Sequence, residues 1–323
     1  MDNSIPPWSL TRRENCRHVD PMIVQLIHNP ASGTHHELRL GVLAQAFEAC
    51  GAKVVMGTTE IDGSMKLASD SDLICVSGGD GTLRLVIAAM QKSGSQTPLC
   101  IFPAGTVNLV AREIGYASEP EQFASEVMRG FLAGKDARLK EPIVTSDHGP
   151  FAACLSAGPD GVAVAQHSPT LKKKIGRAAY AWSFAKLFLR WPRQQYSLEI
   201  IARDGSENSL GCEAFYIAKG RYFAGPWTLT PEAGLGGDVF HLIALSRAGR
   251  WNFIRFMLSI ARGRHPRNLS FARQYPVISM TIGASEEPAN ILFYQEDGDS
   301  MRHVPMQVKM TDYAVEYCLP LDD

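Results

Sequence analysis

The sequence predicts a protein of two domains, a parallel α/β domain followed by a mainly antiparallel β domain. From residue 22 to about 145, short apolar segments alternate with helix-forming ones, which is typical of βαβ units in a parallel sheet. After Gly149, strand-like segments follow one another and are broken by glycine and proline. A chain of 323 residues with 45% hydrophobic content can build a substantial core in each domain.

The expected elements follow this alternation along the chain. In the first domain we expect strands at Ile23–His28, Lys53–Gly57, Leu73–Ser77 and Leu99–Phe102. The expected helices are Glu37–Cys50, Gly63–Ala68, Leu83–Gln91, Leu109–Ile114 and Pro120–Leu132. In the second domain we expect strands at Phe151–Ser156, Tyr196–Ala202, Ala214–Ala218, Val239–Leu245 and Ile278–Ile282, and one basic helix from Pro169 to Leu189.

A glycine-rich turn joins the third expected strand to the next helix. The strand runs into Gly78-Gly-Asp-Gly-Thr82. The N–H groups of a first helical turn are unpaired, and glycine lets an anion approach them, so the turn is suited to phosphate. Asp80 would repel phosphate unless a divalent cation or a transferable proton lay between them. The combination indicates phosphoryl transfer.

A single Gly-Asp-Gly turn is common in α/β proteins, but this sequence has two further loops of the same kind. Pro103-Ala-Gly-Thr-Val-Asn108 follows the fourth strand, and Asn29-Pro-Ala-Ser-Gly33 follows the first. Ligands of doubly wound sheets bind at the carboxyl edge of the strands. We therefore expect the three loops to meet at one site.

Together these segments resemble the diacylglycerol kinase catalytic-domain family, in its bacterial lipid kinase branch, which is related to sphingosine and ceramide kinases. The order Asn-Pro-x-Ser-Gly, Gly-Gly-Asp-Gly-Thr and Pro-x-Gly-Thr-x-Asn carries the likeness, and Asp297-Gly-Asp299 extends it. The resemblance implies the two-domain NAD-kinase/diacylglycerol-kinase-like fold. We expect a loose extension at 1–21, a nucleotide-binding domain at 22–145 completed by 307–323, and a β-rich lipid or acceptor domain at 146–306.

The resemblance also implies an ATP-dependent lipid kinase that phosphorylates the hydroxyl of diacylglycerol or a related long-chain alcohol with Mg²⁺. Asp299 would be the catalytic base, and Asp80 would act in catalysis through the nucleotide-bound magnesium. The implied nucleotide-binding residues are Asn29, Pro30, Ala31, Ser32, Gly33, Thr59, Gly79, Asp80, Gly81, Thr82, Thr106 and Asn108.

Three positions depart from the pattern that the family implies. Leu85 stands where the family usually has glutamate, and Asp299 replaces the glutamate of an Asp-Gly-Glu motif. Gly237 stands where bacterial members place an aspartate that helps to hold a structural Mg²⁺, so we do not expect that metal here. The resemblance also implies an acidic residue just before the first strand of the second domain, and Glu141 is the acidic residue nearest to that position.

These departures leave two alternatives open. One is a catalytically weak nucleotide- or lipid-binding protein of the same fold. The other is an NAD-type kinase, which shares Gly-Gly-Asp-Gly but usually continues differently after its second phosphate loop. Two common phosphate signatures are absent: no G-x-G-x-x-G follows a strand, and Gly130–Lys135 departs from a Walker A loop in spacing, with Asp136 in place of Ser or Thr.

Composition limits the cellular setting. The net charge of −1 gives no general attraction for nucleic acid, and seven cysteines without a C-x-x-C pair favour reduced thiols in a cytoplasmic protein. We expect the polar residues 1–20 to be a loose extension rather than a signal peptide, and no apolar run is long enough to span a membrane. Two segments that combine basic and aromatic residues, 171–193 and 247–267, favour peripheral contact with the inner membrane face, where a lipid substrate is presented. Ordinary amphipathic helices would give the same pattern. The sequence leaves open whether the protein forms a homodimer.

Overall fold

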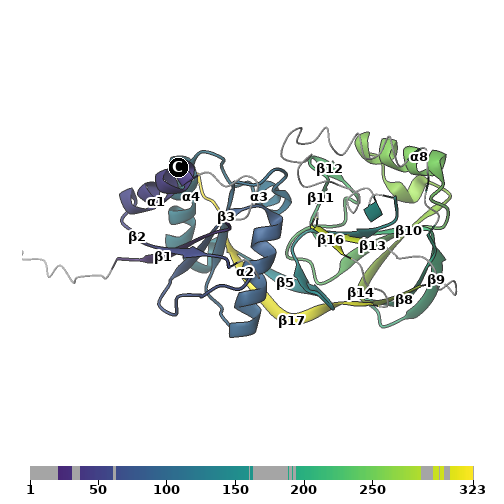
Figure 1. Ribbon diagram of the computed structural model, residues 1–323, viewed down its shortest axis with the longest axis horizontal. Coiled ribbons are helices and arrows are strands. Elements are labelled where there is room, and N and C mark those ends of the chain that lie inside the picture. Colours follow the sequence, from purple (N-terminus) through teal and green to yellow (C-terminus); the bar gives the residue numbers. More distant parts are fainter. Residues whose placement is uncertain are drawn as a thin grey trace, which may run out of the picture.

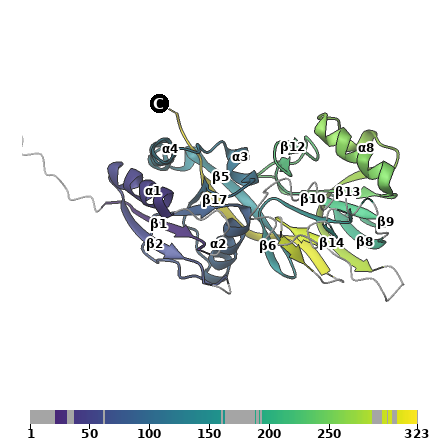
Figure 2. The same ribbon diagram turned by 45° about the horizontal axis from the view of Figure 1, so that its top comes forward.

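The computed structural model describes residues 21–30, 37–60, 63–159, 161–162, 188, 191, 194–284, 294–297, 299–301 and 306–322. These residues form two lobes, an α/β lobe and a β-rich lobe (Figures 1 and 2). The α/β class and the mainly antiparallel second part are as the sequence predicted. The expected basic helix at 169–189 lies almost wholly outside the described residues.

The first lobe contains a parallel sheet in the order β2-β1-β3-β4 with helices beside it (Figure 1). Its strands are β1 (Ile23–His28), β2 (Lys53–Thr58), β3 (Leu73–Gly78) and β4 (Leu99–Pro103). Its helices are α1 (Glu37–Ala49), α2 (Asp80–Ser93), α3 (Leu109–Ile114) and α4 (Pro120–Leu132). Apolar residues fill most positions of β1, β3 and β4 because both faces of this sheet are covered.

The second lobe is built from antiparallel strands that follow β5 (Arg138–Ser146), itself preceded by the 3-10 helix η1 (Gly134–Ala137). The strands are β6 (Gly149–Phe151), β7 (Cys154–Ala157), β8 (Tyr196–Ala202), β9 (Glu207–Cys212), β10 (Ala214–Ala218), β11 (Tyr222–Phe223), β12 (Trp227–Thr228), β13 (Phe240–Leu245), β14 (Ala272–Ala284), β15 (Tyr294–Glu296) and β16 (Asp299–Met301). Helix α8 (Arg250–Ala261) and the 3-10 helix η2 (Pro266–Asn268) complete the lobe.

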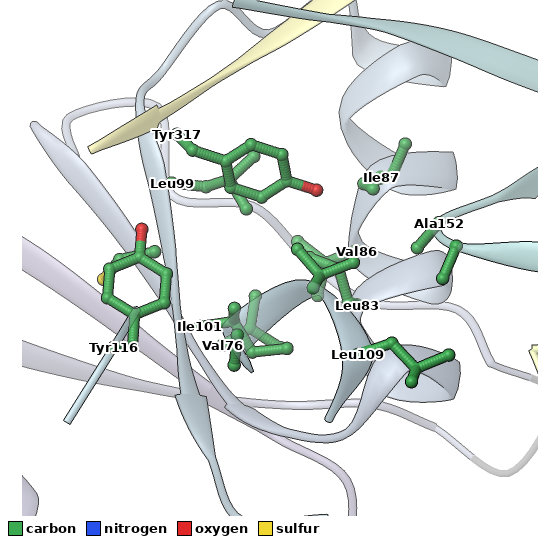
Figure 3. Close-up of a cluster of buried hydrophobic side chains, with 14 of the residues drawn as sticks. Val76, Leu83, Val86, Ile87, Leu99, Ile101, Leu109, Tyr116, Ala152 and Tyr317 are labelled. Carbon is green, nitrogen blue, oxygen red and sulfur yellow. The ribbon is translucent and has the colours of Figure 1, made fainter. Parts of the chain in front are cut away.

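The last strand, β17 (Met306–Cys318), belongs to both lobes (Figure 1). It pairs with β14 in the second lobe, with β5 along most of its length, and in parallel with β4 at Tyr317↔Leu99. Tyr317 packs with Leu99 in the core of the first lobe (Figure 3), and the hydroxyl of Tyr116 donates to the carbonyl of Cys318 at 2.6 Å. One continuous sheet therefore crosses the molecule.

Two sequence predictions need correction. The expected helix Gly63–Ala68 is wrong, since the described residues there are not helical. The buried side-chain amide of Gln25 donates to the carbonyl of Lys66 and accepts from the N–H of Ala68, each at 2.9 Å, and so satisfies that backbone without a helix.

The expected strand Phe151–Ser156 is interrupted. β6 ends at Phe151 and β7 begins at Cys154. Between the two strands, the N–H groups of Ala152 and Ala153 turn toward the carboxylate of Asp297.

Among the residues that the structure describes, no helix is both long and apolar enough to cross a membrane.

Candidate active site

The site is assembled where the parallel strands of the first lobe end. The ends of β1, β2 and β3 lie side by side, with His28 in register with Thr58 and Ser77, and Gly78 is in register with Pro103 at the end of β4. The loops that the sequence singled out leave from this one edge, as expected for a doubly wound sheet.

Two glycine turns meet there with their backbones in contact. A Cβ on Gly105 would lie 2.6 Å from the Cα of Gly79, and one on Gly78 would lie 2.7 Å from the hydroxyl of Thr82. No side chain fits between the loops, which explains glycine at these positions.

Helix α2 starts at this contact and has no side-chain cap, its N-cap being Gly79. Its first N–H groups are therefore suited to an anionic ligand such as phosphate.

Asp80 links the first phosphate loop to the second. Its two carboxylate oxygens accept hydrogen bonds from the N–H groups of Leu109, at 2.9 Å, and Val110, at 3.1 Å, so it caps the start of α3. The carboxylate is 7% exposed, and burial raises its pKa although the two N–H groups lower it. In this structure its described partners are backbone donors, and its predicted role toward magnesium stays a prediction.

Asn108 stands between the two loops in a left-handed conformation, with φ of 54°. Its side-chain amide donates to the carbonyl of Gly105 at 2.9 Å, while its buried Oδ1 has no hydrogen-bond partner among the described residues. A buried acceptor without a donor costs stability, so such a group usually marks a place where a ligand or water binds.

The other predicted residues are placed as follows. The backbone N–H of Thr59 donates to His28 at 3.1 Å, and its buried hydroxyl has no partner within the described part of the chain. Thr106 is exposed on the second loop, while Gly81 and Thr82 lie in the first turn of α2. Asn29 and Pro30 follow β1 directly, and Ala31, Ser32 and Gly33 lie outside the described residues. For Asp299 the structure describes the backbone, at the start of β16.

Asp297 is a site residue to which the sequence reasoning gave no role. It has φ of 48°, and its carboxylate accepts from the N–H groups of Ala152 at 2.6 Å, Ala153 at 2.9 Å and Cys154 at 3.0 Å. Burial, and then the nearby Asp80 carboxylate, raise the pKa of Asp297 to about 7. Asp80 of the first lobe and Asp297 of the second are thus close enough to repel each other. In the sequence, the feature that could have indicated a role for Asp297 is its place as the first residue of the Asp-Gly-Asp motif.

A polar junction beside the site joins α3 and β5 to loops of the second lobe. Lys219, which is 1% exposed, forms an ion pair of 2.7 Å with Glu141 of β5 and donates to the carbonyl of Gly237 at 2.7 Å. Glu113 of α3 accepts from the N–H groups of Arg221, at 2.6 Å, and Leu235, at 2.8 Å. The carbonyl of Gly237 and the carboxylate of Glu141 both face this lysine ammonium, an arrangement that does not fit a metal ion bound at the same place. Among described residues, no group of three or more acidic, histidine or cysteine side chains could hold a metal ion.

Comparison with known proteins agrees with this architecture. Residues 24–136 match the diacylglycerol kinase catalytic domain, and residues 153–318 match the YegS C-terminal NAD kinase beta sandwich-like domain. The chain belongs to the bacterial diacylglycerol-kinase-like family of lipid kinases. As a member of this family it is a phosphotransferase with an alcohol acceptor.

Relatives with curated names point the same way. A diacylglycerol kinase of Bacillus subtilis is 25% identical over 250 residues, covering 75% of this chain and 79% of the relative. A probable lipid kinase YegS-like of Pseudomonas aeruginosa is 28% identical over 220 residues, covering 65% of this chain and 68% of the relative. The crystal structure of a diacylglycerol kinase from Bacillus anthracis superposes with a TM-score of 0.68 at 19% identity, covering 92% of this chain and 96% of that one, which supports the fold.

Proposed function

We propose that this protein transfers the γ-phosphate of ATP to the hydroxyl of diacylglycerol or a related long-chain lipid alcohol. The observation that carries the proposal is the backbone contact between Gly79 and Gly105 at the uncapped start of α2. This cradle suits a phosphate chain, and the relatives named diacylglycerol kinase point to a lipid hydroxyl as acceptor.

The residues present fit a nucleotide. The first N–H groups of α2 would hold its phosphates. The unpartnered Oδ1 of Asn108 would accept a hydrogen bond from the nucleotide, and the hydroxyl of Thr59 would donate one to it. Mg²⁺ bound with the nucleotide would neutralise charge on the transferring phosphoryl group. Asp80 would orient that ion, either directly or by fixing α3 and Asn108 in place. Asp299 would take the proton of the lipid hydroxyl as it attacks.

Lipid would reach the site from a membrane surface contacted by α8. On this helix Phe253, Phe256 and Ile260 are buried, whereas Trp251 is 73% and Leu258 is 44% exposed. The stretch 247–267 holds six arginines and no acidic residue, and each basic residue near an anionic surface contributes about 1 kcal/mol.

Two aromatic residues of the segment 171–193 contact the first turn of α8. The ring of Phe188 lies 6.0 Å from that of Trp251, and the ring of Trp191 lies 5.4 Å from that of Phe253. The contact of Phe188 with the exposed Trp251 supports a membrane-facing surface that includes both rings, while Trp191 and Phe253 pack beneath it in the core.

The deciding experiment is a labelled-ATP assay with Mg²⁺ against a panel of lipids in mixed micelles, with NAD as a soluble acceptor in parallel. We expect label in a lipid product. Label in NAD alone would reverse the choice of acceptor, and tight ATP binding without any product would indicate a binding protein of the same fold. Vesicle sedimentation tests the surface: Trp251→Ala and Arg255→Ser should weaken binding to anionic vesicles, while activity on a short-chain, dispersed substrate should persist.

A further inference from the structure

The junction between the lobes contains a cluster of oxygen atoms like those of a metal site, but the cation among them is the side-chain ammonium of Lys219. The Lys219 ammonium lies 2.7 Å from a carboxylate oxygen of Glu141 and 2.7 Å from the carbonyl oxygen of Gly237. Carboxylate and carbonyl oxygens at a loop are the ligands that hard divalent cations use. Lys219 and Glu141 are almost fully buried, so neither charge is compensated by solvent.

A second carboxylate belongs to the same cluster. Glu113 accepts hydrogen bonds from the N–H groups of Arg221 and Leu235, each two residues from Lys219 or Gly237, so its carboxylate lies beside the ion pair. Burial is the largest influence on both carboxylates and raises the pKa of each. The Lys219 ammonium offsets the repulsion between the buried Glu141 and the half-buried Glu113, which would otherwise separate α3 and β5 from the second lobe.

The same lysine leads directly to the Asp297 loop. Its backbone N–H donates to the carbonyl of Ala153 at 3.0 Å, and the N–H of Ala153 donates to the carboxylate of Asp297 at 2.9 Å. On the other side, Glu113 lies near the end of α3, whose first turn is capped by Asp80. A short path of hydrogen bonds and one helix thus runs from Lys219 to both aspartates.

We propose that Lys219 is the resident cation of the lobe junction and positions Asp297 and Asp80 across it, in the place of a bound divalent ion. The two lobes are held in register at this junction by the chain itself. Removal of the ammonium should expose a latent divalent-cation site formed by Glu141, Glu113 and the Gly237 carbonyl.

Thermal unfolding of the nucleotide-free protein tests this, and the measurement is independent of any kinase activity. We expect EDTA and millimolar Mg²⁺ or Ca²⁺ to leave the wild-type Tm unchanged. Lys219→Ala should lower Tm by about 5 to 10 °C, because it leaves the buried Glu141 carboxylate without its partner. Divalent cations should then restore part of that loss.

Two further variants separate a cation site from general destabilisation. Lys219→Ala/Glu141→Gln should lose the divalent-cation response, because one ligand is gone. Lys140→Ala, at the exposed neighbour of Glu141, should behave as wild type. If Lys219→Ala does not fold, Lys219→Met replaces it in the same series. Two results would overturn the proposal. One is a fall in the wild-type Tm with EDTA; the other is a Lys219→Ala protein that is as stable as wild type and whose Tm does not change with divalent cations.

Discussion

Arg84 of the first lobe and Glu296 of the second form an ion pair across the active site. The guanidinium Nη1 lies 3.5 Å from Oε2 of Glu296, whose side chain is 1% exposed. Arg84 is one turn beyond Asp80 on α2, and Glu296 directly precedes Asp297. The pair therefore ties the two segments that carry the aspartates of the site.

The first prediction concerns this pair. Arg84→Met and Glu296→Gln should each lower the free energy of unfolding by about 2 kcal/mol, since each removes one side of a largely buried charge pair. The double variant should cost less than the sum of the two. Urea denaturation of the four proteins measures the coupling, and strict additivity would show that the pair contributes nothing.

The second prediction concerns the contact of the glycine loops. Gly105→Ala places a methyl group 2.6 Å from the Cα of Gly79 and should force the loops apart. We expect ATP affinity to fall at least 10-fold, or about 1.4 kcal/mol, with the secondary structure retained. The matched control is Gly41→Ala, which has nothing within 4 Å of its new Cβ on helix α1 and should bind ATP normally. Calorimetry with ATP measures the affinity of both variants, and equal affinities for Gly105→Ala and Gly41→Ala would contradict the prediction.

The third prediction concerns Asp80. Asp80→Asn should lower turnover about 100-fold or more. It should also cost about 1 kcal/mol of stability, since one of the two N–H groups at the start of α3 loses its acceptor. Asp136→Asn, at an exposed residue, provides the control. Normal turnover in Asp80→Asn would limit this residue to a structural role.

The fourth prediction concerns Asp299. Asp299→Asn should reduce kcat with little change in the KM for ATP, because the base acts on the acceptor hydroxyl. Asp299→Glu should keep measurable activity, since it restores the residue that the family usually has. Steady-state kinetics of both variants beside Asp312→Asn, an exposed aspartate, make the comparison. A wild-type rate for Asp299→Asn would remove Asp299 from the mechanism.

The fifth prediction concerns the pH dependence of stability. Burial, followed by the repulsion from Asp80, raises the pKa of Asp297 from 3.8 to about 7 in the folded protein. Between these values the native state binds more protons than the unfolded chain, so this residue favours folding at low pH and loses that contribution as pH rises toward 7.

Asp297→Asn cannot titrate, so the stability difference between the wild type and this variant isolates the effect. The wild type should lose stability relative to Asp297→Asn as pH rises from about 4 to 7. Denaturation curves at several pH values measure it. A difference that stays constant with pH would show that the carboxylate titrates alike in both states.

Much of the first lobe could be predicted from local sequence. The strand Ile23–His28 and the helices Leu109–Ile114 and Pro120–Leu132 were placed within their observed bounds, because each is a short apolar or amphipathic run ended by Gly, Pro or Asn. The glycine turns were recognised for the same reason. The helix expected at Gly63–Ala68 failed because its backbone bonds to Gln25, a partner about forty residues away.

The parts of the site that span the two lobes could not be predicted from local sequence. Lys219 follows an apolar strand like any surface lysine, and nothing near it in the sequence indicates Glu141 or Gly237 as partners. Asp297 is held by three N–H groups from more than 140 residues earlier. Such contacts depend on how the strands cross, which spacing along the chain does not encode.

The placement of β17 has a consequence for the order of synthesis. β17, which pairs with β4, follows it by about 200 residues, so the parallel strands of the first lobe are synthesised well before the partner of this edge. During that interval β4 presents an open edge, which invites pairing with other chains. We expect chains truncated before residue 306 to need chaperone protection, and a pulse-labelled nascent chain to become resistant to protease only once β17 has emerged from the ribosome.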